Sequence, residues 1–443
     1  MVECNGKASV FLLRLKLCES IKEDNPLSKL LIEGGRPLEG EVKIHGAKNS
    51  AVAIIAASIL LKGETILENV PRISDVLILL DIIGNLGVEV HWLEEDMISI
   101  HVPDEIDYVA RYAQVRSLRA SNLLLGSLLG RCGKAEVSLP GGCDLGSRPM
   151  DLHIKGLSQL GANIETEEGY LKASAEKLEG HLIYLDFPSV GATENIMMAA
   201  SVAAGQTVIE NVAKEPEIVD LATFLNNAGA KIRGAGTDII KIEGVPSLEG
   251  PRHSIIPDRM EAGTFMAIAA LNQGKICMNN VIPAHLKPVI AKMKEVGVQI
   301  SVSNGGVYVQ GPAQLKAVDI KTLAHPGFPT DMQPPMMSVL SLAKGTSIVV
   351  ENLFENRMQA ANELIRMGAD IKVDGQTAVI RGVDRLYGAT VYSHDLRAGA
   401  AIVAAALAAE GVTEVNGLSV IDRGYLRIEE KLRKLGADIK RVE

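Results

Sequence analysis

The pattern of apolar and polar residues along the chain repeats six times. In each copy, apolar residues at helical spacing end at a glycine, and the alternating residues typical of a strand follow it. A glycine at this point can take the left-handed conformation that closes a helix. The six glycines are Gly87, Gly161, Gly229, Gly297, Gly368 and Gly436, spaced 74, 68, 68, 71 and 68 residues apart. The pattern predicts six structural repeats of about seventy residues each.

A second helix in most repeats consists almost entirely of small and apolar residues, as in NSAVAIIAASILL at residues 49–61 and EAGTFMAIAAL at residues 261–271. Helices that are apolar nearly all round are buried. A glycine turn and another strand follow these helices, so each repeat is expected to run strand, helix, strand, helix, strand, strand. One repeat cannot bury its helices alone. We therefore expect an α/β fold of two domains, each with three repeats, with helices inside and sheets outside.

Composition narrows the possible functions. A chain of 443 residues exceeds what one hydrophobic core usually serves, and 47% hydrophobic residues allow ample cores. A formal net charge of -9 argues against general affinity for nucleic acid or anionic membranes. The cysteines are scattered, with neither a CxxC motif nor zinc-ligand spacing; they are Cys4, Cys18, Cys132, Cys143 and Cys277. We expect a cytoplasmic protein with no structural disulfide, metal or membrane insertion.

Residues 1–26 lie outside the repeats. Their apolar stretch SVFLLRLKL is interrupted by Arg14 and Lys16, is too short to span a bilayer, and lacks a small-residue cleavage pattern after it. A cleaved signal peptide is the less favoured alternative. We expect an N-terminal extension that is disordered.

Charged residues gather in the polar loops that precede the buried helices. These loops read HGAKNSA with Lys48, GGCDLGSRP with Arg148, PSVGATEN, PDRMEAG, FPTDMQ with Asp331, and HDLRAGA with Asp395 and Arg397. The N-terminus of a helix offers unpaired N–H groups and the positive end of its dipole, which suit phosphates and carboxylates. Lys48 alone would be interpreted as a solvated residue at a helix start. The set of loops together favours an anion-binding site.

Two residues in these loops allow both a structural and a chemical interpretation. Cys143 lies in a glycine-rich loop near Arg148, where a thiol with a perturbed pKa can move protons, and we favour this over a merely buried thiol. Burial as a small hydrophobic residue is the preferred interpretation for Cys132 and Cys277. Asp331 is suited equally to capping a helix and to accepting a proton from a hydroxyl, and the pattern leaves both open.

Several ordered motifs resemble the UDP-N-acetylglucosamine 1-carboxyvinyltransferases, a family of enolpyruvyl transferases. They include GAKNSA, LRAS, LPGGC, SVGAT, PTDMQ, FENR, DLRA and IDRGY, and the resemblance runs from about residue 31 to the C-terminus. It implies two inside-out α/β barrels with the active site in the cleft between them. The first domain would comprise residues 48–255, and the second residues 27–47 together with 256–443.

The resemblance also implies a reaction. Family members transfer the enolpyruvyl group of phosphoenolpyruvate to the 3′-hydroxyl of UDP-N-acetylglucosamine by addition and elimination, releasing phosphate, in the first committed step of peptidoglycan synthesis. They use no metal or organic cofactor. The implied partners are therefore these two small molecules, with no nucleic acid and no membrane.

Residue roles follow from the same motifs. Lys48 would bind phosphoenolpyruvate, Asp331 would orient or deprotonate the sugar hydroxyl, and Cys143 would deliver a proton to C3 and be the target of the epoxide fosfomycin. Arginines would supply positive charge; they are Arg119, Arg148, Arg397 and Arg423, the last also counted as catalytic. Further implied substrate-binding residues are Asn49, Pro149, Met150, Asp151, Leu152, Ser189, Val190 and Leu353. Asp144, beside the thiol, departs from the family pattern and is expected to raise the pKa of Cys143.

Two other functions compete with this one. The first is 5-enolpyruvylshikimate-3-phosphate synthase, which shares the fold but does not require a loop cysteine, so GAKNSA and GGC count against it. The second is a catalytically idle relative that acts as a regulatory binding partner. Loss of charged site residues would be expected there, yet Lys48, Asp331 and Arg397 are all present.

Overall fold

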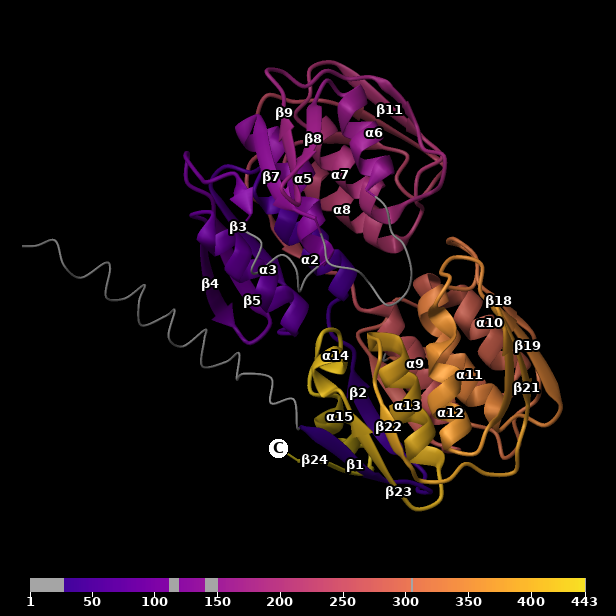
Figure 1. Cartoon of the computed structure of the whole chain (residues 1–443). Helices are drawn as coiled ribbons and strands as arrows, with labels where there is room; N and C mark the ends of the chain where they lie inside the picture. The colour runs from indigo at the N-terminus through magenta and orange to yellow at the C-terminus, as the bar shows by residue number, and fades with distance from the viewer. Residues whose placement is uncertain (1–27, 111–118, 140–149, 304–305, 443) are drawn as a thin grey trace, which may run out of the picture.

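The computed structural model describes residues 28–110, 119–139, 150–303 and 306–442. The expected disordered extension at residues 1–26 lies outside these ranges, and so do Cys143, Arg148 and Pro149. Within the described ranges the molecule has two halves, one above the other in Figure 1.

The upper half contains three four-stranded sheets. The first has the order β14 (Arg252–Ser254), β3 (Glu64–Glu68), β5 (Met97–His101), β4 (Glu89–Glu94). The second is β6 (Val109–Ala110), β7 (Lys134–Ser138), β9 (Tyr170–Ser174), β8 (Asn163–Glu167), and the third β10 (Leu182–Tyr184), β11 (Gln206–Glu210), β13 (Ile239–Glu243), β12 (Lys231–Arg233). In each sheet the first two strands are parallel and the other neighbours antiparallel.

The lower half repeats this arrangement three times, with the same parallel and antiparallel pairs. Its first sheet is β2 (Glu39–Lys43), β15 (Lys275–Asn279), β17 (Gly306–Gln310), β16 (Gln299–Ser303). The second is β18 (Ile320–Lys321), β19 (Thr346–Val350), β21 (Thr377–Arg381), β20 (Asp370–Asp374), and the third β22 (Thr390–Tyr392), β23 (Val412–Asn416), β1 (Lys29–Glu33), β24 (Asp438–Val442).

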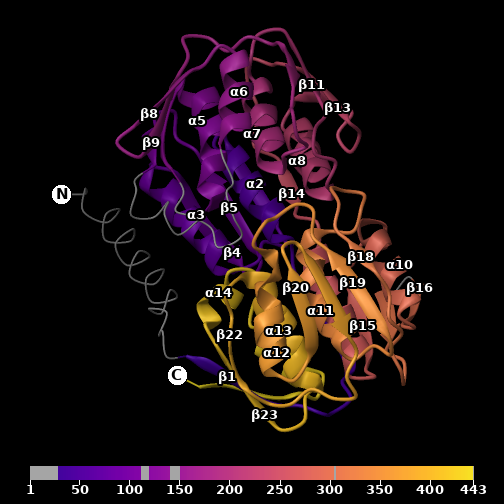
Figure 2. The same ribbon diagram turned by 45° about the vertical axis from the view of Figure 1, so that its right-hand side comes forward.

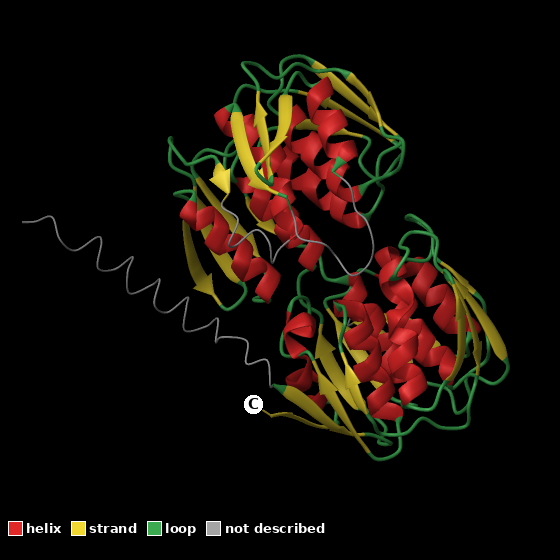
Figure 3. Cartoon of the chain, viewed as in Figure 1, coloured by secondary structure: helices red, strands yellow, loops and turns green. Residues whose placement is uncertain are grey.

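The helices lie inside the sheets, as the apolar pattern predicts (Figure 3). Every residue of α9 (Arg259–Leu271) is buried, and so are residues 50–58 of α2 (Lys48–Ser58), because neither helix has a continuous polar face for solvent. The other central helices are α5 (Leu124–Cys132), α7 (Val190–Ala200), α11 (Gln333–Ser341) and α13 (Leu396–Ala408). The helices that connect the second and third strands of the repeats are α3 (Ser74–Asn85), α6 (Asp151–Gln159), α8 (Pro216–Asn227), α10 (Lys287–Glu295), α12 (Ala360–Arg366) and α15 (Ile428–Lys434), with α14 (Leu418–Asp422) before the last.

The six repeat glycines take the conformation expected of them. Their φ angles all lie between 96° and 105°, each directly after a connecting helix, so the prediction of six helix-closing glycines is confirmed. The repeat β6, α5, β7, α6, β8, β9 also has the predicted order of elements. Short 3-10 helices complete the fold; they are η1 (Arg119–Leu123), η2 (Pro283–Leu286), η3 (Thr330–Met332) and η4 (Arg357–Gln359).

Two separate hydrophobic cores correspond to the two halves. One is built from residues between 51 and 255, the other from residues 30–44 together with residues between 260 and 439. The chain passes between the halves along two segments that run side by side: Ala47 N donates to Ile256 O at 2.7 Å, and Asp258 N to His45 O at 2.8 Å. Figure 2 shows the early strand β1 in the lower half, in the same sheet as β22 and β23 and away from the early helices α2 and α3 of the upper half. No described helix is long and apolar enough to cross a membrane.

Candidate active site

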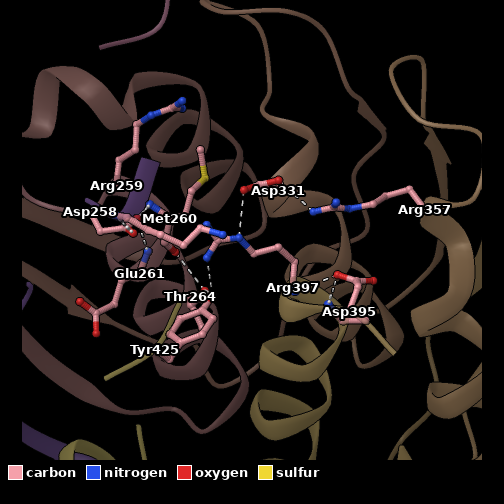
Figure 4. Close-up of polar contacts among 12 residues, drawn as sticks. Asp258, Arg259, Met260, Glu261, Thr264, Asp331, Arg357, Asp395, Arg397 and Tyr425 are labelled. Atoms are coloured by element: carbon pink, nitrogen blue, oxygen red, sulfur yellow. Dashed lines mark hydrogen bonds and ion pairs between the residues drawn. The ribbon is translucent and has the colours of Figure 1, made fainter. Parts of the chain in front are cut away.

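Asp331 lies between two buried arginines in the lower half (Figure 4). It belongs to η3, at the start of α11, and its Oδ2 accepts a hydrogen bond from Arg397 Nε at 2.9 Å while Oδ1 accepts one from Arg357 Nη2 at 2.9 Å. The side chains of Arg397 and Arg357 are 4% and 2% exposed, whereas that of Asp331 is 25% exposed. The carboxylate is therefore the one member of this group open to a ligand.

The two guanidinium groups control the charge of Asp331. Burial alone would raise the pKa of its carboxyl, but the charges of Arg397 and Arg357 outweigh burial and hold the pKa well below its usual range. Lys48 contributes to the same effect, which places this lysine of the upper half near the group. At neutral pH Asp331 is thus an ionised carboxylate inside a cationic cluster.

Arg397 is fixed from three sides. Asp395 caps α13 and accepts hydrogen bonds from Arg397 N at 2.8 Å and Ala398 N at 3.1 Å, which explains the aspartate two residues before the arginine. Tyr425 Oη accepts a hydrogen bond from Arg397 Nη1 at 3.1 Å and is itself 2.8 Å from Thr264 Oγ1. The guanidinium group is therefore held in one orientation before any substrate arrives.

A second charged group joins the two halves. Asp75, in the first turn of α3, accepts from Lys48 Nζ at 3.0 Å and from Arg423 Nε at 2.8 Å. Burial would raise the pKa of the Asp75 carboxyl, yet Lys48 and Arg423 together keep it below its ordinary value. Lys48 and Arg423, both predicted from the sequence, thus meet on one carboxylate.

Asp258 connects the start of α2 to the segments along which the chain passes between the two halves. Its Oδ1 accepts from Met260 N at 2.7 Å and Glu261 N at 3.1 Å and so caps α9, while its Oδ2 accepts from Lys48 N at 3.3 Å. One carboxylate thereby holds the starts of α9 and α2 together, which positions Lys48 relative to the lower half.

Leu353, another predicted site residue, follows β19 in the lower half. Further predicted residues lie at helix starts of the upper half. Asn49 is the exposed second residue of α2, Ser189 caps α7 by accepting from Ala192 N at 3.4 Å, and Val190 is the first residue of that helix. Met150 is buried and precedes Asp151 and Leu152, which begin α6. Among the described residues, no hydrogen bond or ion pair connects these positions directly to Asp331 or Asp75.

Sequence reasoning assigned no role to three residues of this region. Arg357 lies within the FENR motif but was given no function, although it bonds Asp331 directly. Tyr425 likewise lies within the IDRGY motif without an assigned function, although it bonds Arg397. Asp75 carries no local signal, because its partners lie 27 and 348 residues away along the chain. The described residues contain no group of three or more histidine, cysteine, aspartate or glutamate side chains placed to hold a metal ion.

Comparison with known proteins places the chain in a family. Residues 32–432 match the family model described as EPSP synthase (3-phosphoshikimate 1-carboxyvinyltransferase). UDP-N-acetylglucosamine 1-carboxyvinyltransferase 1 from Caldanaerobacter subterraneus subsp. tengcongensis is 55% identical over 414 residues, covering 94% of this chain and 99% of that protein. The chain belongs to the UDP-N-acetylglucosamine 1-carboxyvinyltransferase family. A member from Halothermothrix orenii is 52% identical over 417 residues, covering 94% of this chain and all of that protein.

Solved structures of enolpyruvyl transferases share the fold of this member of the UDP-N-acetylglucosamine 1-carboxyvinyltransferase family. The enolpyruvyl transferase NikO from Streptomyces tendae matches with a TM-score of 0.84 and 26% identity, over 94% of this chain and 99% of that one. EPSP synthase from Acinetobacter baumannii matches with a TM-score of 0.75 at 20% identity, over 94% of this chain and all of that one, which shows a shared fold. As a member of the carboxyvinyltransferase family, the protein is an enzyme that transfers a group, and its expected enolpyruvyl transferase fold is confirmed.

Proposed function

We propose that the protein transfers the enolpyruvyl group of phosphoenolpyruvate to the 3′-hydroxyl of UDP-N-acetylglucosamine and releases phosphate. The observation that carries the proposal is the open carboxylate of Asp331 held between Arg397 and Arg357. The reaction needs a group that accepts a hydroxyl proton, and Asp331 is an ionised carboxylate that is 25% exposed and held in place by two arginines.

The chemistry begins with Asp331. A carboxylate bonded to two arginines is a weak base, because protonation would cost both charge-assisted hydrogen bonds. The negative charge of phosphoenolpyruvate bound near Asp331 would raise the pKa of this carboxyl. The bound substrate thereby activates the base that removes the proton of the sugar hydroxyl.

The addition and elimination steps then balance. The sugar oxygen bonds to C2 as its proton passes to Asp331, and the double bond of the enolpyruvyl group takes a proton at C3 from Cys143. The tetrahedral intermediate next returns a proton from C3 to the thiolate of Cys143 and expels phosphate from C2, which restores the double bond and the thiol. Lys48 and Arg423 would stabilise the charge of the departing phosphate, together with Arg148. The role of Cys143 rests on the family motif, since Cys143 lies outside the described residues.

The remaining substrate contacts are proposed by motif: Asn49, Arg119, Pro149, Met150, Asp151, Leu152, Ser189, Val190 and Leu353. We further propose the domain division at residues 48–255 and at 27–47 with 256–443, with the active site between the domains. It is supported by the two hydrophobic cores and by Asp75, which bonds Lys48 of one half and Arg423 of the other. The proposed reaction would be the first committed step of peptidoglycan synthesis, in the cytoplasm.

The test is release of phosphate from phosphoenolpyruvate by the purified protein, with UDP-N-acetylglucosamine, with shikimate 3-phosphate, or with neither. Release that requires UDP-N-acetylglucosamine is expected, and it should be abolished by fosfomycin and strongly reduced in Cys143→Ala. Release that requires shikimate 3-phosphate would instead identify the synthase activity. No release with either acceptor would favour the idle regulatory relative.

A further inference from the structure

Glu351, directly after β19, is a buried carboxylate with many neutral partners. It is 1% exposed, and its Oε1 accepts hydrogen bonds from Leu353 N at 2.8 Å, Thr322 Oγ1 at 2.9 Å and Phe354 N at 3.2 Å. Its Oε2 accepts from Thr330 Oγ1 at 2.9 Å. Within the described chain it forms no salt bridge. A buried charge is costly unless its oxygens are fully hydrogen-bonded, so this residue has to order the groups around it.

The donors come from two segments of the chain, the loop between β18 and η3 and the residues that follow β19. Thr322 follows β18, Thr330 immediately precedes Asp331 in η3, and residues 353–354 begin the segment that leads to Arg357 in η4. Thr322 also bonds the residue after Glu351: its Oγ1 accepts a hydrogen bond from Asn352 N at 2.9 Å, and its carbonyl oxygen accepts one from Asn352 Nδ2 at 2.8 Å. Glu351 therefore holds the loop of Asp331 against the loop of Arg357.

The same two loops meet again at the site itself, where Arg357 Nη2 bonds Asp331 Oδ1 at 2.9 Å. The contacts form a closed ring: Asp331, its neighbour Thr330, Glu351, the chain from 352 to 357, and Arg357 back to Asp331. If the hydrogen bonds of Glu351 are lost, the two loops can shift relative to each other, and the distance between Asp331 and Arg357 changes. The spacing between Asp331 and Arg357 thus depends on a residue that touches neither of them.

We propose that Glu351 is a positioning residue that sets the placement of Asp331 relative to Arg357 and Leu353. Its catalytic effect rests on the proposed function, since Asp331 is the proposed base and Leu353 a proposed contact to the sugar nucleotide. A misplacement of about 1 Å can cost roughly a hundredfold in rate, so loss of this tie should impair turnover well beyond its effect on folding.

Two matched threonine variants separate positioning from stability. Thr330→Val and Thr322→Val each replace one hydroxyl donor to the same carboxylate by a methyl group of similar size. Thr322 is fully buried and also binds Asn352 N, so Thr322→Val should lower the melting temperature more. Thr330→Val should lower kcat/KM for UDP-N-acetylglucosamine more, by about tenfold or greater. If the carboxylate had only a structural role, Thr322→Val would show the larger loss of both melting temperature and kcat/KM. That result would overturn the proposal.

Glu351→Gln tests the carboxylate directly, because an amide nitrogen would face donors that need an acceptor. Its control is Glu363→Gln in α12: Glu363 is also buried and also accepts from a backbone group, Tyr392 N at 3.1 Å, but is bonded to neither Asp331 nor Arg357. Crystal structures of both variants and the unchanged protein report the distance from Asp331 Oδ1 to Arg357 Nη2 without any turnover. We expect the distance to lengthen in Glu351→Gln alone.

The two readouts keep the two proposals apart. An unchanged ion pair in Glu351→Gln contradicts the positioning role whatever the activity. If the ion pair opens in Glu351→Gln while the unchanged protein releases no phosphate with UDP-N-acetylglucosamine, the positioning role stands and the proposed reaction fails.

Discussion

Arg423 Nε lies 2.8 Å from Asp75 Oδ1, although the two residues are 348 positions apart in the chain and pack in different halves of the molecule. The other oxygen of Asp75 bonds Lys48 Nζ at 3.0 Å, so a carboxylate of the protein occupies the position between two cations proposed for phosphate. Asp75 and an anionic ligand therefore compete for the same charges.

Asp75→Asn should strengthen the binding of inorganic phosphate, because the amide keeps the shape of the side chain and removes its charge. We expect the dissociation constant to fall about tenfold, which is about 1.4 kcal/mol. Isothermal titration with phosphate measures this. Asp81→Asn, on the exposed face of the same helix, is the control. Unchanged or weaker binding of phosphate in Asp75→Asn would show that Asp75 does not compete with ligands.

The pH profile of the reaction should depend on Arg357. The pKa of Asp331 lies below its usual range, because its two arginines outweigh the effect of burial, so the carboxylate stays ionised at moderately acidic pH. In Arg357→Gln one positive charge is lost, the pKa of Asp331 rises, and activity that needs the ionised form disappears at higher pH. We expect the acidic limb of kcat/KM to move up by about one to two pH units.

The measurement is kcat/KM for UDP-N-acetylglucosamine between about pH 3 and pH 9. Arg366→Gln is the matched control, since Arg366 is 61% exposed and its partner is Glu363. An acidic limb at the same pH in all three proteins would mean that the ionisation of Asp331 does not control the rate.

Fosfomycin should modify one cysteine. We expect a single covalent adduct on Cys143, located by mass spectrometry of peptides, and none on Cys132 or Cys277. Cys277 is buried, and burial raises the pKa of the Cys132 thiol, which lowers its reactive thiolate fraction at neutral pH. Modification of Cys132 with Cys143 untouched would contradict the proposed role of the loop thiol.

Acid stability should depend on Glu261 in α9. Its carboxylate accepts from His45 N at 2.9 Å and pairs with Lys431; burial alone would raise its pKa, but Lys431 and His45 lower it from 4.5 to about 2. A carboxyl with a lowered folded-state pKa stabilises the fold above pH 4.5, and this contribution is lost as the pH falls toward 2. The full shift corresponds to at most about 3 kcal/mol, and the net value of the pair is smaller because burial lowers the pKa of Lys431.

Urea unfolding at about pH 6 and pH 3 of the unchanged protein and of Glu261→Gln measures this contribution. The difference in free energy of unfolding between the two should shrink at the lower pH. Glu39→Gln, which removes an exposed carboxylate of β2, should follow the unchanged protein at both values. A constant difference would indicate that Glu261 does not titrate differently in the folded and unfolded states.

Local pattern was enough to predict most of the fold. The helix-closing glycines and the helices without a polar face are properties of short windows, so the six repeats and the buried helices follow from them. The pairing of β1 with β23 and β24 joins residues some 380 to 410 positions apart, and no window contains it. The assignment of residues 27–47 to the second half came only from family resemblance.

The residues of the candidate site were likewise predictable only in part. Lys48, Asp331 and Arg397 stand at the starts of helices, where a charged residue is visible as an exception to an apolar pattern. Asp75 also stands in a first turn, but an acidic residue there is ordinary helix chemistry and indicates nothing further. Glu351 shows no pattern, because Thr322 and Thr330, which connect it to the loop of Asp331, lie 29 and 21 residues away along the chain.

The pairing of β1 also determines the order in which the molecule can be completed on the ribosome. All sheets of the upper half use strands between residues 64 and 254, so that half is finished while later codons are still being read. Strand β1 is translated before any of them, yet both its partners emerge about 380 residues later, roughly 20 to 80 s at a synthesis rate of about 5–20 residues per second. Throughout that interval β1 is an unpaired strand with both edges open, and it is the segment of the nascent chain most in need of protection from wrong partners.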